Sequence, residues 1–392
     1  MASITASRRR GGFGSTAAGR LGSNPAAAWR HLDVVLVGCL AAIAAIGVLM
    51  VYSSTRGPGG DAAYDSSFLK KQALFVVLGF GVMILGTVID YHRVRDFAPL
   101  AYVGGVGLLG LVISPLGSNR KGTQAWFDLG PFQLQPSELM KLALIVVLAA
   151  VVAQFRDDFD LRRIAIVLVV AGVPLALILR QPDLGTALVL VCVTAGVLLV
   201  GGADPKHLLA LLLVGVIGIG VVLNSDMLAD YQRDRLTTFL SQGSGEGLRQ
   251  EAYNLEQSKI AIGAGGMFGQ GLFDGPQTRL GNVPEQHTDF IFTAVGEELG
   301  FAGAGTLLAL FAIVCWRVWR TAQLARDDLG ALICVGVLSM LLFQIFENVG
   351  MTMGIMPITG IPLPFVSYGG SSTLAAFAAM GLVLNVHARR FS

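Results

Sequence analysis

The sequence predicts an all-α membrane protein that crosses the bilayer about ten times. Hydrophobic residues make up 54% of its 392 residues and charged residues 14%, whereas soluble proteins carry about 25% charged residues. The mean hydropathy is +0.66. Apolar runs long enough to span a bilayer, roughly 17–25 residues, recur along the chain. Because backbone polar groups in lipid must pair within the chain, we expect these runs to be helices.

Ten apolar runs approach the spanning length. They lie at 33–53, 71–90, 97–115, 138–154, 163–180, 184–201, 207–224, 289–316, 330–350 and 364–387. Between the fifth and sixth runs stands Gln181-Pro182-Asp183, which is compatible with a turn between two spans or with one helix broken into two halves.

The basic residues predict the orientation. If the N-terminus lies inside, more than half of the 28 Lys and Arg residues fall on the cytoplasmic side, as the positive-inside rule requires. Much of the remainder lies in residues 225–288, and loops longer than about 60 residues largely escape that rule. We therefore expect both termini in the cytoplasm and a large extracytoplasmic loop at about 225–288, between the seventh and eighth spans.

The N-terminal segment differs from the rest in composition. Residues 1–30 are rich in Gly, Ser, Ala and Arg and are expected to be a disordered cytoplasmic tail. The run that follows has full spanning length, so it is expected to be a retained first helix and not a signal peptide. Residues 31–392 are expected to form a single membrane domain.

Some classes of function are disfavoured by composition. A net charge of +2, without basic residues interleaved with aromatic ones, argues against a nucleic-acid partner. The four cysteines stand singly in apolar runs and are interpreted as small buried hydrophobic residues. The chain has no G-x-x-x-x-G-K-[ST] phosphate loop and no H-E-x-x-H zinc motif. Any chemistry is therefore expected from carboxylates in the polar outer segments 114–141, 225–288 and 351–372.

The first outer segment ends in "QPSELMK". Pro136 is expected to stop the preceding structure and Ser137 to cap the next helix. Glu138 in the first turn is favoured by the helix dipole, and Lys141 shares its face. Spacing alone fits a capped helix with a surface ion pair. Ionisable residues inside spans usually face a cavity or pathway, so a pair facing a hydrated cavity is the alternative.

A second acid stands at the start of an apolar run, in "VPEQHTDFIF" at 283–292. Thr288 or Asp289 is expected to cap the helix that follows. A cap alone accounts for an acid here; the functional alternative is a general base at the boundary between water and lipid. Deeper in the membrane, Glu298 and Glu347 are candidates for buried polar partners of each other.

Five motifs together resemble a known family. They are "WFDLGPFQLQPSELMK", "QPDLGTA", "YNLEQSKIAIGAGGMFGQG", "VPEQHTDFIFTAVGEELG" and "ITGIPLPFVSYGGSS". In order, and from about residue 33 to 388, they resemble the shape, elongation, division and sporulation (SEDS) family of bacterial cell-wall polymerases. Pro362 is similar to the elongation-type members, because division-type members usually carry Thr there.

The resemblance implies a peptidoglycan glycosyltransferase. Such an enzyme joins lipid II, a membrane lipid, into glycan strands at the outer face of the bacterial cytoplasmic membrane, with a class B penicillin-binding transpeptidase as partner. The essential aspartate of the family falls on Asp289. The family also implies substrate-binding roles for Glu138 and Lys141, which line a cavity, and for Trp126 and Asp183.

The charge of the pyrophosphate leaving group needs a counter-charge. Lys141, Arg120, Arg235 or a divalent cation (Mg²⁺ or Mn²⁺) are the candidates, and no other cofactor is expected. Two alternatives to a polymerase remain at this stage. A lipid flippase or transporter fits many spans and intramembrane acids. A non-catalytic scaffold that recruits an enzyme is the other.

Overall fold

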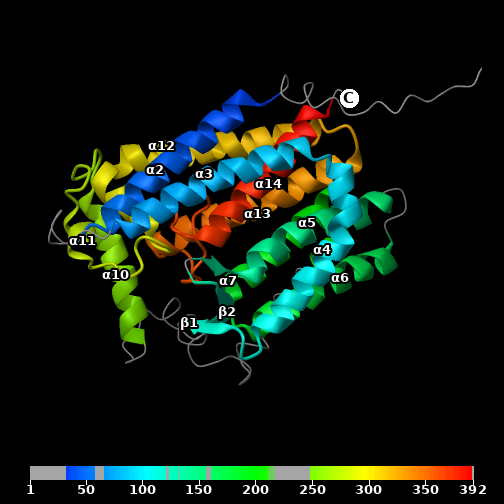
Figure 1. Cartoon of the computed structure of the whole chain (residues 1–392), viewed down its shortest axis with the longest axis horizontal. Helices are drawn as coiled ribbons and strands as arrows, with labels where there is room; N and C mark the ends of the chain where they lie inside the picture. The colour runs from blue at the N-terminus through cyan, green and yellow to red at the C-terminus, as the bar shows by residue number, and fades with distance from the viewer. Residues whose placement is uncertain are drawn as a thin grey trace, which may run out of the picture.

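The fold is a bundle of long helices with a small β-sheet at one end (Figure 1). The computed structural model describes residues 32–57, 66–120, 123–130, 132–155, 160–211, 213, 215 and 248–390. Its helices are α2 (Val34–Ser54), α3 (Ser67–Val88), α4 (Tyr91–Val112), α5 (Pro136–Gln154), α6 (Leu161–Arg180), α7 (Leu184–Val200), α10 (Leu248–Ala264), α11 (Pro276–Leu280), α12 (Ile291–Gln323), α13 (Asp328–Met353) and α14 (Gly370–Ala388). Its strands are β1 (Ser118–Arg120), β2 (Thr123–Asp128) and β3 (Gln133–Leu134).

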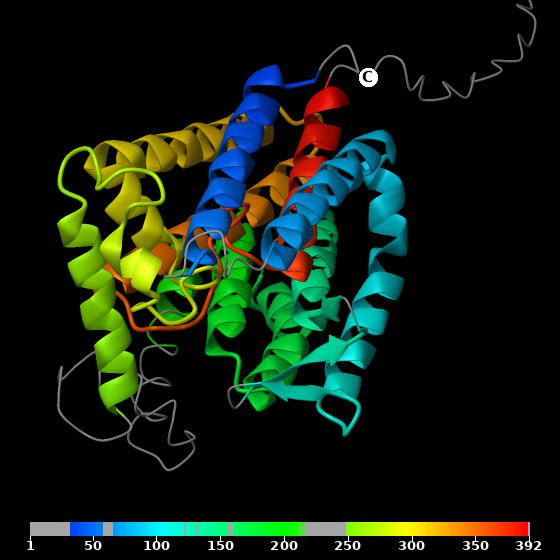
Figure 2. The same cartoon turned by 60° about the vertical axis from the view of Figure 1, so that its left-hand side comes forward.

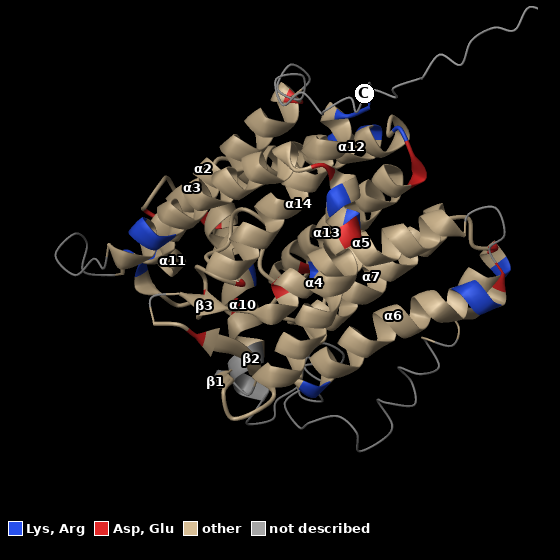
Figure 3. Ribbon diagram, turned by 45° about the vertical axis from the view of Figure 1, so that its right-hand side comes forward, with Lys and Arg blue, Asp and Glu red and all other residues tan. Residues whose placement is uncertain are grey.

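The predicted all-α polytopic membrane fold is confirmed. Eight helices in the described part of the chain are long and apolar enough to cross a membrane, and α7 is apolar but shorter, at 17 residues. Charged residues gather near the helix ends, and other residues make up most of the helix lengths (Figure 3). The predicted span 207–224 is helical at its start, and most of it lies outside the described residues. So do the tail 1–30 and residues 225–247 of the large loop, so the count of ten stays a prediction.

Two predicted helix starts are wrong. α4 begins at Tyr91, six residues before the apolar run, because the Asp90 side chain accepts a hydrogen bond from the backbone N–H of His92 and caps the helix. α14 begins at Gly370, six residues after the apolar run begins. The residues just before Gly370 form a loop instead. Pro362 and Pro364 in this loop have no backbone N–H and cannot donate helix hydrogen bonds.

The segment at Gln181-Pro182-Asp183 is a turn between two complete helices. α6 and α7 pack against each other and α5 packs against both, so the idea of two half-helices in line is wrong. The Asp183 side chain accepts a hydrogen bond from the Thr186 N–H and caps α7. A strong cap directly after the turn starts a new helix and does not continue the old one.

The three strands were not expected from the sequence. The three are antiparallel in the order β1-β2-β3 and cover only a few residues each. They lie within the polar segment 114–141, between α4 and α5. The sheet is therefore an elaboration of one connection and leaves the helical membrane fold unchanged.

α13 and α14 form the centre of the bundle. α13 contacts α5, α7, α10, α12 and α14, and α14 packs along most of α3 (Figure 1). In the most apolar window of α14, 83% of the residues are buried, against 17% for α4 at the periphery. Gly86 on α3 and Gly381 on α14 let the two backbones approach closely, as small residues do between helices in lipid.

α12 is interrupted at Gly300, whose φ of 65° and ψ of −165° are not helical. Backbone N–H groups of Phe301 and Ala302 donate to the carbonyls of Gly266 and Met267. A Cβ on Gly300 would lie 2.2 Å from the Gly269 nitrogen, so only glycine fits this contact. The interruption thus fixes the segment after α10 to the side of α12.

The ends of the described chain meet at one end of the bundle. Figure 2 shows the start of α2 and the end of α14 together there. Arg317, near the end of α12, pairs with Asp33, the cap of α2, at 2.6 Å. Termini on a common side agree with the predicted orientation; that this side is cytoplasmic stays a prediction.

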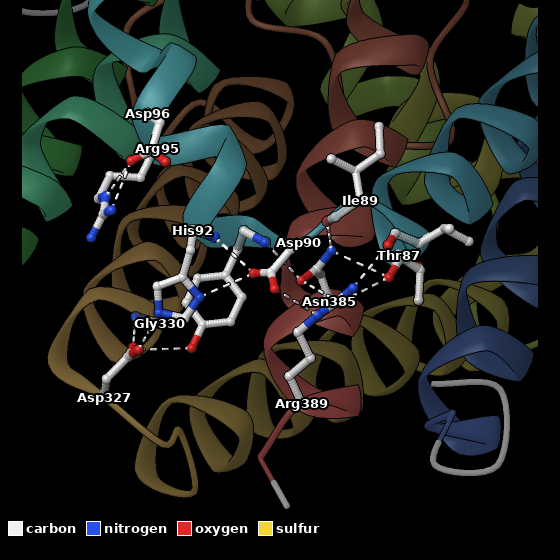
Figure 4. Close-up of polar contacts among 12 residues, drawn as sticks. Thr87, Ile89, Asp90, His92, Arg95, Asp96, Asp327, Gly330, Asn385 and Arg389 are labelled. Carbon is white, nitrogen blue, oxygen red and sulfur yellow. Dashed lines mark hydrogen bonds and ion pairs between the residues drawn. The ribbon is translucent and has the colours of Figure 1, made fainter. Parts of the chain in front are cut away.

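A polar cluster closes the same end (Figure 4). His92 lies between two carboxylates, with Nδ1 3.0 Å from Asp90 and Nε2 2.8 Å from Asp327. Asn385 on α14 donates to the carbonyls of Gly86, Thr87 and Ile89 at the end of α3. These contacts bind α3, α4, α13 and α14 to one another at this end.

The charge of Asp90 should contribute stability that depends on pH. Burial raises the pKa of the Asp90 carboxyl. Hydrogen bonds from His92 and the charges of Arg389 and His92 lower this pKa by more than burial raises it, so it lies below its ordinary value. A carboxyl with a lowered folded pKa stabilises the fold above its unfolded pKa, about 3.9, and loses this effect as the pH falls through the folded pKa.

We expect Asp90→Asn, which keeps the helix cap, to destabilise the protein by roughly 1–3 kcal/mol at pH 7. The difference in melting temperature from the wild type should shrink as the pH falls below the unfolded pKa of about 3.9 and be smallest once the pH is below the folded pKa, which is lower still. Melting curves of both proteins in detergent, at pH 7 and at a series of pH values below about 3.9, measure it. An equal difference at every pH would show that the Asp90 charge is not responsible.

Candidate active site

The loop between α13 and α14, residues 354–369, organises the other end of the bundle. Its part from residue 361 to 367 is mostly buried although it is not helical: Ile361, Leu363, Phe365 and Val366 are each at most 4% exposed. Buried peptide groups need partners, and side chains supply them. The Leu363 N–H donates to Ser367 Oγ at 2.8 Å, and Gln72 Nε2 donates to the Ser367 carbonyl at 3.2 Å.

Asp289 lies directly beside this loop. A Cβ placed on Gly360 would be 3.4 Å from Asp289 Oδ2, and Gly360 has a φ of +73° that favours glycine. The expectation that Thr288 or Asp289 caps α12 is wrong. Residues 284–290 form turns, the cap position is Phe290, and no side chain closes the helix start.

The turn carrying Asp289 is joined to the loop a second time. The Tyr368 N–H donates to the His287 carbonyl at 2.9 Å. The rings of His287, Tyr368 and Phe68 lie 5.1–5.7 Å apart between centroids, in edge or tilted arrangements typical of packed aromatic rings. The start of α3 therefore supports the turn from the other side.

Glu138 and Lys141 form a buried ion pair on α5. Lys141 Nζ lies 2.8 Å from Glu138 Oε1, and both side chains are almost completely buried. The interpretation as a surface ion pair is wrong because both charges lie in the interior. The alternative, a pair that faces a hydrated cavity, stays a prediction. Ser137 is not the cap: Pro136 is the first helical residue, Gln135 is the cap position, and Ser137 Oγ is buried with no hydrogen-bond partner in the described part of the chain.

The pair lines a narrow pocket with a cavity volume of about 10 Å³, room for about one water molecule. The walls come from α5, α13, the loop and the start of α14; they include Glu138, Lys141, Gln344, Pro362, Leu363, Pro364, Ser367, Ser372 and Thr373. Thr373 Oγ1 is buried and has no hydrogen-bond partner among the residues that the structure describes, so the pocket holds a polar group with unused hydrogen-bonding capacity.

Asp183 reaches the same loop through its neighbours. Its Oδ2 accepts from Thr186 Oγ1 at 2.8 Å and from Gln135 Nε2 at 3.3 Å. Gly185, two residues on, packs so closely that a Cβ would lie 2.7 Å from Ile361. Asp183 is thus a helix cap that also links the start of α5 to the start of α7.

Trp126 lies on β2 and is half-buried. Its carbonyl accepts a hydrogen bond from Ser118 Oγ across the sheet. The sheet joins the loop region through Ser371 at the start of α14, whose hydroxyl donates to the Gln133 carbonyl and accepts from the Gln135 N–H. The structure therefore gathers Asp289, Asp183 and the Glu138–Lys141 pair around one loop, with Trp126 on an adjoining sheet.

The expected partnership of Glu298 and Glu347 is wrong. Glu298 accepts hydrogen bonds from Ser53 Oγ and the Phe273 N–H, and Glu347 accepts from Thr359 Oγ1. Glu297, on the turn before Gly300, accepts from the Gln277 and Thr278 N–H groups. Glu297 and Glu298 accept from backbone N–H groups of residues 273–278, and Glu347 accepts from a side-chain hydroxyl of the loop after α13. Non-helical backbone near lipid needs such side-chain acceptors.

Three residues that support the site were missed in the sequence. Asn348, Gln72 and Ser371 all bond to backbone of the loop region or the strand beside it. A signal exists for Asn348 alone: Gln344, Glu347 and Asn348 recur at helical spacing within an apolar span, which marks a polar stripe.

Over the described ranges, no three His, Cys, Asp or Glu side chains come together as a resident metal centre requires. Because Mg²⁺ is commonly held by one or two carboxylates together with substrate phosphates, a divalent cation that enters with the pyrophosphate stays a prediction. The side chain of Arg120 and all of Arg235 lie outside the described part of the structure, so neither is placed relative to the site.

The sequence matches a family model described as a cell cycle protein, FtsW/RodA/SpoVE, over residues 33–391. The chain belongs to this family. It is 38% identical to stage V sporulation protein E of Bacillus subtilis, over 90% of this chain and 96% of that one. It is 35% identical to a probable peptidoglycan glycosyltransferase FtsW of Geobacter sulfurreducens, over 91% and 95% of the two chains.

Other members of the FtsW/RodA/SpoVE family extend the likeness. The peptidoglycan glycosyltransferase MrdB of Escherichia coli K12 is 33% identical, over 92% of this chain and 94% of its own. A chain from a peptidoglycan synthase complex that coordinates polymerization and crosslinking superposes with a TM-score of 0.77 and 31% identity, covering 93% of this chain and all of that one. The rod shape determining protein RodA of Thermus thermophilus superposes with a TM-score of 0.69 and 31% sequence identity, covering 93% of this chain and 99% of that one.

Breaking the buried ion pair should be costly. We expect Lys141→Met to destabilise the protein by about 3–5 kcal/mol, because Glu138 would keep a buried, uncompensated charge. The double variant Glu138→Gln with Lys141→Met should recover much of that loss. Melting temperatures of the wild type, both single variants and the double variant measure the coupling. If the stability loss of the double variant equals the sum of the losses of the two single variants, the two side chains do not interact.

Proposed function

We propose that the chain, a peptidoglycan glycosyltransferase of the FtsW/RodA/SpoVE family, joins lipid II units into glycan strands at the outer face of the bacterial cytoplasmic membrane. The observation that carries the proposal is the gathering of Asp289 and the Glu138–Lys141 pair around the buried loop at one end of the bundle. The family relationship gives the class of reaction, and the position of the acids gives the roles.

The reaction needs a base and a counter-charge. A sugar hydroxyl of one substrate attacks the anomeric carbon of the other, the glycosidic bond forms, and the bond to undecaprenyl pyrophosphate breaks. Asp289 takes the hydroxyl proton, and the pyrophosphate leaves with the bonding electron pair. Attack opposite the leaving group inverts the anomeric centre to β.

Lys141 is the described cation best placed to offset the pyrophosphate charge. Its ammonium group has three N–H donors, and one of them contacts Glu138. A cation in a pocket of low dielectric acts on developing negative charge more strongly than it would in water. Glu138 holds Lys141 in place, and Asp183 holds the walls of the pocket through Gln135 and α7.

A place at the boundary between water and lipid suits this substrate. The sugars and pyrophosphate of lipid II are polar, while its polyprenyl tail is apolar. Asp289 is half-buried and is followed at once by the buried residues Phe290, Ile291 and Phe292. A base in this position can reach sugars in water while the tail stays in the bilayer.

Pro362 favours an elongation-type role, like RodA, over a division-type role, like FtsW. This residue lines the same pocket as the Glu138–Lys141 pair. A flippase or transporter would need a path through the midplane, whereas the candidate residues here gather at one end of the bundle. Purified protein with labelled lipid II tests these functions: polymer supports the proposal, translocation without polymer supports a transporter, and neither supports a scaffold.

Asp289→Asn should abolish polymerisation while the protein still folds. Asn has nearly the same shape and keeps the backbone contacts of this position, but it cannot accept a proton at neutral pH. We expect a rate loss of at least about 100-fold, the range for removal of a general base. Polymer length and amount on gels, with fluorescent lipid II, measure it.

Glu285→Gln is the matched control for Asp289→Asn. Glu285 is an exposed carboxylate on the same turn, four residues earlier. This control should polymerise at the wild-type rate. Near-wild-type activity of Asp289→Asn would mean that Asp289 is not the base.

The transpeptidase partner, a class B penicillin-binding protein, is proposed to pack its single span against α12. Ala304 packs on the core of the bundle, so it belongs to internal packing. Gly305 and Ala309 face outward: Phe301 on the same side is 70% exposed, and a Cβ on Gly305 meets no atom within 4 Å. Small residues on such a face allow close approach of a second helix.

Gly305→Leu with Ala309→Leu should reduce co-purification with the transpeptidase by at least about 10-fold, because the added side chains separate the helices by steric contact. Gly104→Leu on α4, where a Cβ also meets nothing within 4 Å, is the control and should bind normally. Pull-down of a tagged partner from detergent measures both. Unchanged binding, with both variants monodisperse, would place the partner on another helix.

A further inference from the structure

The structure assigns to Asn348, on α13, the role of positioning Asp289 for proton transfer. This inference rests on the proposed function. Asn348 is fully buried. Its Nδ2 donates one hydrogen bond to the Asp289 carbonyl at 2.7 Å and another to the Ile361 carbonyl at 2.8 Å. One amide group therefore joins the turn that carries Asp289 to the loop that Asp289 faces.

The need for such a residue follows from the start of α12. Asp289 stands outside the helix, two residues before Ile291, and the cap position carries no side-chain hydrogen bond. Its own N–H donates to the Glu285 carbonyl at 3.2 Å, which holds it within a local turn. A turn alone does not fix the distance between Asp289 and the loop that lines the pocket of Glu138 and Lys141. Asn348 supplies that link from α13, which lies at the centre of the bundle.

The chemistry of the amide suits this task. The Nδ2 group of Asn offers two N–H donors on one uncharged atom, whereas Ser offers one donor and Lys brings a charge. Asn348 Oδ1 is buried with no hydrogen-bond partner among the described residues. Turning the amide over would place Oδ1 against two carbonyl oxygens and leave both carbonyls unpaired. The two donor bonds therefore set a single orientation.

The same link fixes the surroundings of the Asp289 carboxylate. Ile361, which Asn348 binds, follows Gly360, the residue that packs against Asp289 Oδ2. The residue directly before Asn348 on α13, Glu347, accepts a hydrogen bond through Oε1 from Thr359 Oγ1 at 2.9 Å. α13 thus fixes the position of residues 359–361 relative to Asp289. A misplacement of about 1 Å at a reacting group can cost about 100-fold in rate.

Asn348→Ala removes both bonds, and Asn348→Gln keeps both donors but moves them by one methylene. For purified variants polymerising lipid II, we expect kcat to fall by about 10- to 100-fold for Asn348→Ala and by less for Asn348→Gln. KM for lipid II should stay within about threefold of the wild type, because binding groups such as Lys141 are untouched. Asn348→Gln should melt close to the wild type and so carries the test if Asn348→Ala does not fold.

Asn385→Ala is the matched control. Asn385 is also a fully buried asparagine whose Nδ2 donates to backbone carbonyls, but it lies in the polar cluster at the other end of the bundle (Figure 4). Its loss should lower the melting temperature and leave kcat per folded molecule unchanged. This separates a role in positioning Asp289 from a general role in stability.

The outcomes distinguish the inference from the proposed function. Wild-type kcat in folded Asn348→Gln and Asn348→Ala, or equal falls in kcat for Asn348→Ala and Asn385→Ala, would overturn the positioning role. Wild-type protein and Asp289→Asn are run in the same assay. Absence of polymer from the wild type, or full activity of Asp289→Asn, would instead overturn the proposed function or the base.

Discussion

The loop between α13 and α14 imposes the constraint on which the candidate site depends. It runs as non-helical backbone among apolar helices, where each peptide group must find a partner. Leaving one buried polar group unpaired costs about 1–3 kcal/mol. Side chains of Asn348, Gln72 and Ser367 provide the partners. These polar residues in apolar surroundings are therefore a consequence of the loop.

The same arrangement accounts for the grouping of the charged residues. The loop contacts the turn of Asp289, the start of α7 after Asp183, and the pocket of Glu138 and Lys141. Helices that are far apart in the sequence thus present their polar ends to one small region. An ionisable group at such a place is costly unless it is paired or functional. Lys141 is paired with Glu138, and Asp289 is the residue to which we assign chemistry.

The sequence was informative wherever a pattern was long or local. Apolar length predicted the membrane helices, and the i, i+3 spacing predicted contact between Glu138 and Lys141. It failed where tertiary contacts decided the outcome. The run 364–387 looked like one helix because apolar residues of a buried loop cannot be distinguished from lipid-facing ones by composition. Phe365 and Val366 are apolar because they are buried in the loop and not because they belong to a membrane helix.

The motifs named Asp289, Glu138, Lys141 and Asp183 as candidates, and the fold brings them around one loop, while their roles stay predictions. The cap assigned to Asp289 and the pairing of Glu298 with Glu347 were wrong. Both errors have one cause: Asn348 and the acids bind backbone of segments distant in sequence, such as Ile361 and Phe273. Spacing along one helix carries no information about those segments.

The central claim is that Asp289 and the loop meet at the outer surface of the cytoplasmic membrane. Labelling of single introduced cysteines in intact cells with a membrane-impermeant maleimide tests this most directly. Glu285→Cys, on the exposed part of the Asp289 turn, should be labelled at once. Asp96→Cys, exposed near the start of α4 at the opposite end, should be labelled only after the membrane is permeabilised. The reverse pattern, with Asp96→Cys labelled in intact cells and Glu285→Cys protected, would contradict the account.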